Sequence, residues 1–186
     1  MILQDFLALS DEYFDTLDQS LYDDKKELLH YFYRLQTEFQ LLYEAFPYAS
    51  INTVLFCLVN IDSILSKQDY FDSLDDRKEK FLSLFSVKNA EYVSKYSTEK
   101  ITDVLYNFKS ASKYRTLIDP IECLLGYVLK HFLSLFQILD YIIEMKMFQN
   151  GTYQDFYDKN KNTIEEKIGD IFIYMLLLNG LLNEPE

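Results

Sequence analysis

The sequence has no tryptophan, and only two cysteines, four glycines and three prolines among its 186 residues. So few glycines and prolines leave little material for the tight turns that join β-strands. The two cysteines, Cys57 and Cys123, lie in apolar stretches and are not spaced as a metal-binding knuckle. This pattern favours free thiols in a reduced compartment.

Targeting and membrane signals are missing as well. No basic segment precedes the short apolar start of the chain, which argues against a secretory signal. The most apolar stretches are interrupted by polar and charged residues, so none is a convincing membrane span. We therefore expect a cytoplasmic protein.

Basic residues are scarce: 18 Lys and Arg stand against 30 Asp and Glu, and the formal net charge is −12. A surface of this sign repels nucleic acid and anionic membranes. We expect no direct nucleic-acid binding, no membrane association, and a partner that is a protein with a basic surface. The composition leaves homo-oligomerisation open.

What the chain does have is helical periodicity. Apolar residues recur at spacings of three and four in three long stretches, at 28–46, 119–151 and 164–182. The stretch 51–65 is apolar on all sides, which indicates a helix buried among others. The sequence therefore predicts an all-α, compact single-domain helical bundle over residues 1–186. We expect about six to eight helices around a long central helix at about 120–149.

Local signals predict where the elements begin. Asp119 and Pro120 form an N-terminal cap for the central helix, and Gly151 marks its end. One or two short helices are expected before residue 24, and a further helix is expected to start at 97–98. Residues 87–96 fit either a short helix or a loop, and 109–115 should fray. Capping-box patterns predict helix starts at 20–23, 73–76 and 163–166. A similar pattern at 152–155 predicts a short turn.

The sequence carries no strong catalytic signature. His30 and His131 are its only histidines. His30 has neither a carboxylate four residues away nor a Cys or Ser placed as a nucleophile, and Glu122 and Asp140 lie too far along the helix to contact His131. We interpret both as surface or core-edge residues. Glycine-rich phosphate loops and paired cysteine motifs are missing. We predict no catalytic residue and no cofactor, and favour a non-enzymatic protein.

Two pairs of carboxylates suggest a different possibility, a metal site. Asp140 and Glu144 lie four residues apart near the end of the central helix, and Glu166 and Asp170 lie four apart in the last helix. If these helices pack antiparallel, the four side chains can converge on an oxygen-rich site suited to Mg²⁺ or Mn²⁺.

The run Glu-Glu-Lys-Ile-Gly-Asp-Ile-Phe-Ile-Tyr at 165–174 resembles the MazG family of all-α nucleoside triphosphate pyrophosphatases. That family spaces its acids three residues apart, and the resemblance covers roughly the last quarter of the chain. It implies a Mg²⁺-dependent nucleotide hydrolase as the alternative function.

The acidic N-terminal segment supports the preferred function. Residues 1–24 hold seven acids and no base, interleaved with aromatic residues. We predict that part of this segment binds a partner, through Asp11, Glu12, Phe14, Asp15 and Asp18. Opposite charge speeds the encounter with a basic protein. The predicted function is that of a non-enzymatic protein that binds another macromolecule: an inhibitor, an immunity or antitoxin-like factor, or a defence antagonist.

Overall fold

The computed structural model describes residues 1–15, 27–96, 102–114, 119–149 and 151–184. These residues form seven helices and no strand, and Ile2 and Asp103 make one isolated bridge. The all-α prediction is therefore confirmed, and the number of helices lies in the expected range. The helices are α1 (Leu3–Asp15), α2 (Leu28–Glu44), α3 (Ile51–Ser66), α4 (Tyr70–Tyr96), α5 (Tyr106–Tyr114), α6 (Pro120–Gln149) and α7 (Tyr153–Leu182).

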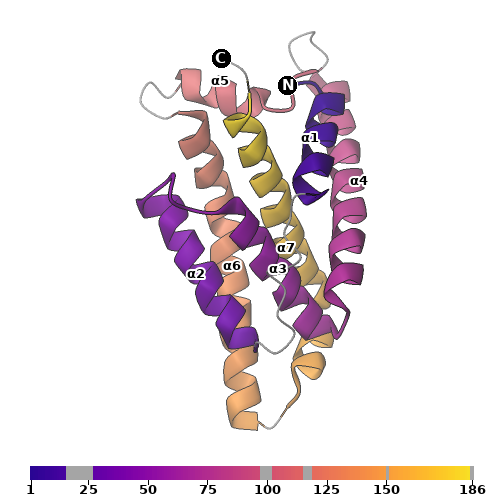
Figure 1. The fold of residues 1–186 in the computed structure, drawn as a ribbon, viewed down its shortest axis with the longest axis vertical. Coiled ribbons are helices and arrows are strands. Elements are labelled where there is room, and N and C mark those ends of the chain that lie inside the picture. The colour runs from indigo at the N-terminus through magenta and orange to yellow at the C-terminus, as the bar shows by residue number, and fades with distance from the viewer. Residues whose placement is uncertain (16–26, 97–101, 115–118, 150, 185–186) are drawn as a thin grey trace.

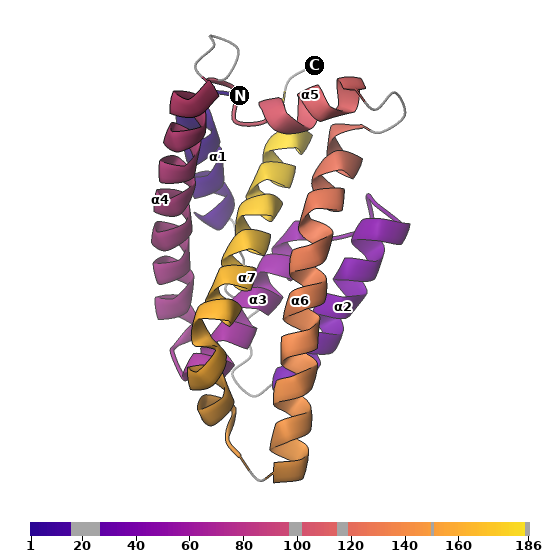
Figure 2. The same cartoon turned by 180° about the vertical axis from the view of Figure 1, so that it is seen from behind.

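Helices α6 and α7 form a long antiparallel hairpin in the middle of the bundle (Figure 1). Helix α6 is the predicted central helix, and Oδ1 of Asp119 caps it by accepting a hydrogen bond from the N–H of Glu122 at 2.9 Å. Helix α7 packs against α6, α3, α4 and α1, while α2 packs on α3 and α6. Helix α5 lies across the end of the bundle where α6 begins (Figure 2).

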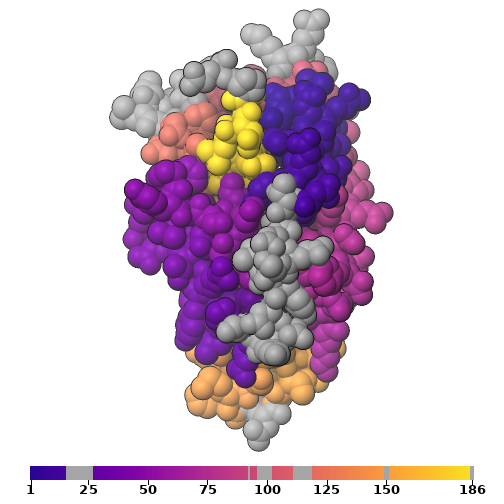
Figure 3. Space-filling view, in the orientation of Figure 1, coloured from indigo at the N-terminus to yellow at the C-terminus, as the bar shows by residue number. Residues whose placement is uncertain are grey.

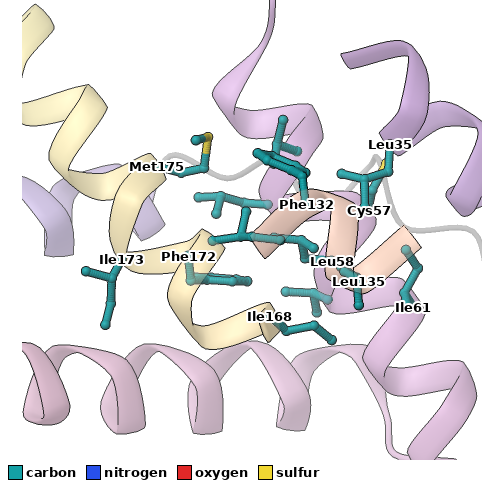
Figure 4. Packing of buried hydrophobic residues seen from close by; sticks show 14 of the residues in the cluster. Leu35, Cys57, Leu58, Ile61, Phe132, Leu135, Ile168, Phe172, Ile173 and Met175 are labelled. Atoms are coloured by element: carbon teal, nitrogen blue, oxygen red, sulfur yellow. The ribbon is translucent and has the colours of Figure 1, made fainter. Parts of the chain in front are cut away.

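The core lies where α3, α6 and α7 meet. Figure 4 shows Leu58 of α3, Leu135 of α6 and Phe172 of α7 gathered in one cluster, and all three are buried. Every residue from 53 to 63 of α3 is buried, as its apolar sequence predicts. Helix α6 alone among the described helices is long and apolar enough to cross a membrane, and 44% of its most apolar 18-residue stretch is buried inside the bundle.

Helix α4 begins earlier than its sequence suggests. Ser73, which the pattern at 73–76 assigns to an N-cap, is instead buried inside the helix. Asp69 caps the helix, since its Oδ1 accepts a hydrogen bond from the N–H of Phe71 at 3.2 Å. The helix then runs unbroken to Tyr96, so the ambiguous segment 87–96 is helical.

Helix α7 is also longer than predicted. Thr152 and Asp155 form a complete capping box, so the expected short turn at 152–155 is the start of the last helix. The start predicted at 163–166 is wrong, because those residues lie inside α7. Residues 109–114, which we expected to fray, belong to α5. The starts predicted at 20–23 and 97–98 lie outside the described residues.

Candidate functional site

The structure does not bring the four predicted metal ligands together. Helices α6 and α7 are antiparallel, as the prediction assumed, but Asp170 lies opposite His131: its Oδ2 is 2.9 Å from Nδ1 of the histidine. Asp140 is nine residues further along α6, about 13 Å at 1.5 Å per residue. It is exposed, as is Glu144, and exposed Glu166 pairs with the neighbouring Lys167. The described residues hold no group of three or more His, Cys, Asp or Glu side chains placed to bind a metal.

The predicted partner surface on α1 is only partly available. Phe14 is a core residue rather than a surface contact, because it is 5% exposed and its ring stacks on that of Phe172 with centroids 5.9 Å apart. Asp11 and Asp15 are exposed, but Nζ of Lys78 lies 3.0 and 3.6 Å from their carboxylates.

The other two residues of that prediction are Glu12 and Asp18. Glu12 is exposed, and Asp18 lies outside the described residues. The acidic α1 and helix α4 lie side by side at the surface (Figure 3). The α1 acids are thus one edge of a larger surface.

An acidic stripe runs along the outside of α4. Its members, spaced so that they share one side of the helix, are Asp72, Asp75, Asp76 and Glu79, and all four are exposed. None of them forms an ion pair with another described residue. Lys78, on the adjacent side of α4, is engaged with the acids of α1. The stripe therefore keeps its negative charge within the part of the chain that the structure describes.

A groove of about 670 Å³ lies beside this stripe, between α4 and residues of α3 and α7. Asp76 and Glu79 of α4 and Glu165 of α7 line it, together with Lys80, whose Nζ lies 3.4 Å from the carboxylate of Glu165. Leu84 and Val87 add an apolar wall, with 37% and 54% of their surfaces exposed. The groove thus combines negative charge with accessible apolar surface.

A buried ion pair lies at the inner side of the groove. Asp62 of α3 is 2% exposed and Arg77 of α4 is 5% exposed. Nε of Arg77 donates to Oδ2 of Asp62 at 3.1 Å, and Nη2 contacts the other carboxylate oxygen. Two contacts of this kind fix the planar guanidinium against the carboxylate. They also fix α4 against α3 next to the groove.

A second cavity, of about 430 Å³, lies between α4, α5, α6 and α7. His131 is 8% exposed on its wall, with its ring 5.7 Å from that of Tyr174. Its Nδ1 is buried next to Asp170 without a well-aligned hydrogen bond to any described residue. Lys88 and Lys130 line the same cavity, and Nζ of Lys88 is 3.9 Å from Asp170.

Burial and the neighbouring charges set the pKa of His131, and burial and Asp170 have the two largest effects. Burial lowers its pKa because the charged ring loses water, whereas the carboxylate of Asp170 raises it. Burial has the larger effect, so the pKa of His131 lies below its ordinary value. Burial therefore favours the neutral imidazole over the protonated one.

No direct signal in the sequence predicts this cavity. The carboxylate beside His131 comes from another helix, so spacing along α6 cannot reveal it. One weak signal exists, because His131 interrupts an apolar face of its helix, between Val128 three residues before it and Leu135 four residues after it. Comparison with protein-family models, curated proteins and solved structures found no match for this chain.

Proposed function

We propose that the protein binds a partner polypeptide with basic side chains, and that it does so through the outer face of α4. The observation that carries the proposal is the stripe Asp72, Asp75, Asp76 and Glu79, whose charges other described residues leave unpaired, next to an open groove. This α4 face replaces the α1 segment as the main proposed surface.

Charge supports a basic partner. Exposed carboxylates at consecutive turns of one helix attract lysine and arginine side chains and accelerate their encounter with the surface. The acids of α1 extend the negative region, since α1 packs beside α4.

The groove adds a second kind of recognition. Leu84 and Val87 offer apolar surface to an aliphatic side chain. Glu79 and Glu165 line the same groove and offer carboxylates to a basic side chain. A segment that combines basic and aliphatic residues matches both features. Such binding is compatible with an inhibitor, an immunity or antitoxin-like factor, or a defence antagonist.

The test compares two variants with the same change in net charge. One removes the stripe (Asp72→Asn, Asp75→Asn, Asp76→Asn, Glu79→Gln). The control neutralises four other exposed acids (Glu27→Gln, Glu91→Gln, Asp140→Asn, Glu144→Gln). A partner captured from host lysate with the wild-type protein is identified, and its association rate with all three proteins is measured at low and high salt.

We expect the stripe variant to associate about tenfold more slowly at low salt and the control to associate nearly as fast as wild type. The difference should shrink at high salt, because screening acts over about 8 Å at physiological ionic strength. Equal rates for the stripe variant and the control would reject the α4 face. Val87→Ser should raise the dissociation rate if the groove contributes.

A further inference from the structure

We propose that the cavity around His131 is a binding site for a small organic anion. Its carboxylate or phosphate group would lie between His131, Lys88 and Lys130, and its apolar body would extend toward α5. This proposal is independent of partner binding at the α4 face, because the two sites are lined by different residues.

Positive groups outnumber negative ones at one end of the cavity, in a chain whose net charge is −12. Lys88 and Lys130 both line it, and Lys130 forms no ion pair with a described residue. Among the described residues that line this end, Asp170 carries the negative charge, and Nζ of Lys88 lies 3.9 Å from it. Of the neighbouring residues, Lys167 adds positive charge near His131, and Glu166 is paired with that lysine.

Asp103, the other acid that lines the cavity, is already neutralised. One of its oxygens lies 2.8 Å from the N-terminal ammonium and the other 2.7 Å from Nζ of Lys109. It therefore adds little repulsion against an anion. The charge balance of the cavity favours an anionic group at the His131 end.

Away from His131, apolar residues form one continuous part of the cavity wall, and Asn89 and Asn107 line the cavity as well. Along α7 its wall changes from Asp170 to Ile173 and then Leu177, seven residues or about 10 Å further on. Phe85, Val104 and Phe108 complete this part of the wall. A volume of about 430 Å³ falls in the usual range for small-molecule sites. The shape therefore suits a ligand with one anionic end and an aromatic or aliphatic body.

His131 couples this binding to protons. Its Nδ1 lies against Asp170, so Nε2 is the ring nitrogen left for the ligand. Burial favours the neutral imidazole in the free protein, whereas an anion beside it favours the protonated form, which donates a hydrogen bond from Nε2. Lys88, Lys130 and Lys167 oppose that protonation, whereas the ligand and Asp170 support it. Binding should take up a proton and therefore strengthen as the pH falls from 8 to 6.

The experiment follows the imidazole C–H signals by proton NMR in the full chain. Only two histidines are present, and His30→Gln assigns their signals. His30 is exposed on α2 and serves as an internal control. The probes are phenyl phosphate and benzoate, with inorganic phosphate, benzyl alcohol and benzylamine as comparisons. We expect phenyl phosphate or benzoate to shift the His131 signal saturably, to leave His30 unchanged, and to raise the pKa of His131.

Two variants locate the anionic group. Lys88→Gln with Lys130→Gln should weaken the better probe about tenfold or more, because each lost charge removes a charge-assisted contact. Lys159→Gln, at an exposed site elsewhere on α7, should leave the affinity unchanged. Three results would each overturn the proposal: no saturable His131 shift, equal binding of benzylamine, or unchanged affinity in the double variant. Equal affinity for inorganic phosphate and phenyl phosphate would do the same, since the apolar body would then contribute nothing.

Discussion

Breaking the buried ion pair between Asp62 and Arg77 should destabilise the bundle strongly. The two side chains join α3 to α4 and are 2% and 5% exposed. Asp62→Asn leaves a guanidinium buried without its counter-charge, and Arg77→Met leaves a buried carboxylate in the same condition. Removing one partner of such a pair costs about 3–5 kcal/mol of unfolding free energy.

This cost translates into a clear thermal effect. One kcal/mol shifts Tm by about 2–4 °C in a chain of this length, so each single variant should melt roughly 6–20 °C below wild type. The double variant Asp62→Leu/Arg77→Met removes both charges and leaves apolar atoms in their place. Most of the loss should be recovered there, since well-packed apolar replacements of buried pairs are often neutral or stabilising.

Urea unfolding followed by circular dichroism measures wild type, Asp62→Leu, Arg77→Met and the double variant as a double-mutant cycle, with Asp62→Asn as a further single variant. Lys80→Met is the matched control from the same helix. Its ion pair with Glu165, at 3.4 Å, involves a lysine that is 52% exposed, so its removal should cost no more than about 1 kcal/mol. The reasoning fails if Asp62→Asn and Arg77→Met each cost less than the control. It also fails if the double variant is as unstable as the sum of the single ones.

Two further predictions concern other parts of the fold. Gly169→Ala should cost about 1–3 kcal/mol in urea unfolding, because the new Cβ would lie 2.5 Å from the ring of buried Phe81. Gly126→Ala, in the exposed part of α6 with open space around it, should instead stabilise by about 0.5–1 kcal/mol, and the reverse order would contradict the packing. Burial raises the pKa of Glu184, but hydrogen bonds from Lys109 and the N-terminal ammonium outweigh it and hold that pKa below its usual range. Its contribution to stability is therefore complete above the ordinary carboxyl pKa and is lost as the pH falls below it. Urea midpoints between pH 6 and 3 should accordingly fall less steeply for Glu184→Gln than for wild type.

The sequence predicts the long helices well, because their apolar residues recur at helical spacing. It predicts where the helices begin only in part. Helix α3 and the start of α6 agree with the prediction, because an all-round apolar run and the Asp119 cap leave little choice. The patterns at 73–76 and 163–166 failed for a common reason. Each is preceded by aromatic residues that are buried when the helix begins earlier: Tyr70 in α4, and Phe156 and Tyr157 in α7. The burial of those rings outweighs a local cap.

The candidate sites depend on helix register, which the sequence does not contain. Antiparallel packing of α6 and α7 was predictable, but whether Asp170 faces His131 or Asp140 depends on where the hairpin closes. Starting α7 at Tyr153 instead of 163 adds almost three turns to the helix. The acid pairs at 140–144 and 166–170 are therefore at different levels of the bundle. Sequence analysis selected Asp170 as a candidate residue and assigned it the wrong neighbours.

Helix α7 contributes one carboxylate to each proposed site. Glu165 lines the groove beside α4, and Asp170 lines the cavity around His131. Five residues turn a helix by about 140°, so the two carboxylates face different sides of α7. Between them lies Gly169, where α7 approaches the Phe81 ring of α4 too closely to admit a Cβ without a shift. Because α4 lines both the groove and the cavity, a side chain at this glycine would move a wall of each. We therefore expect substitution at Gly169 to disturb binding at both sites, whereas Lys130→Gln should affect the cavity alone.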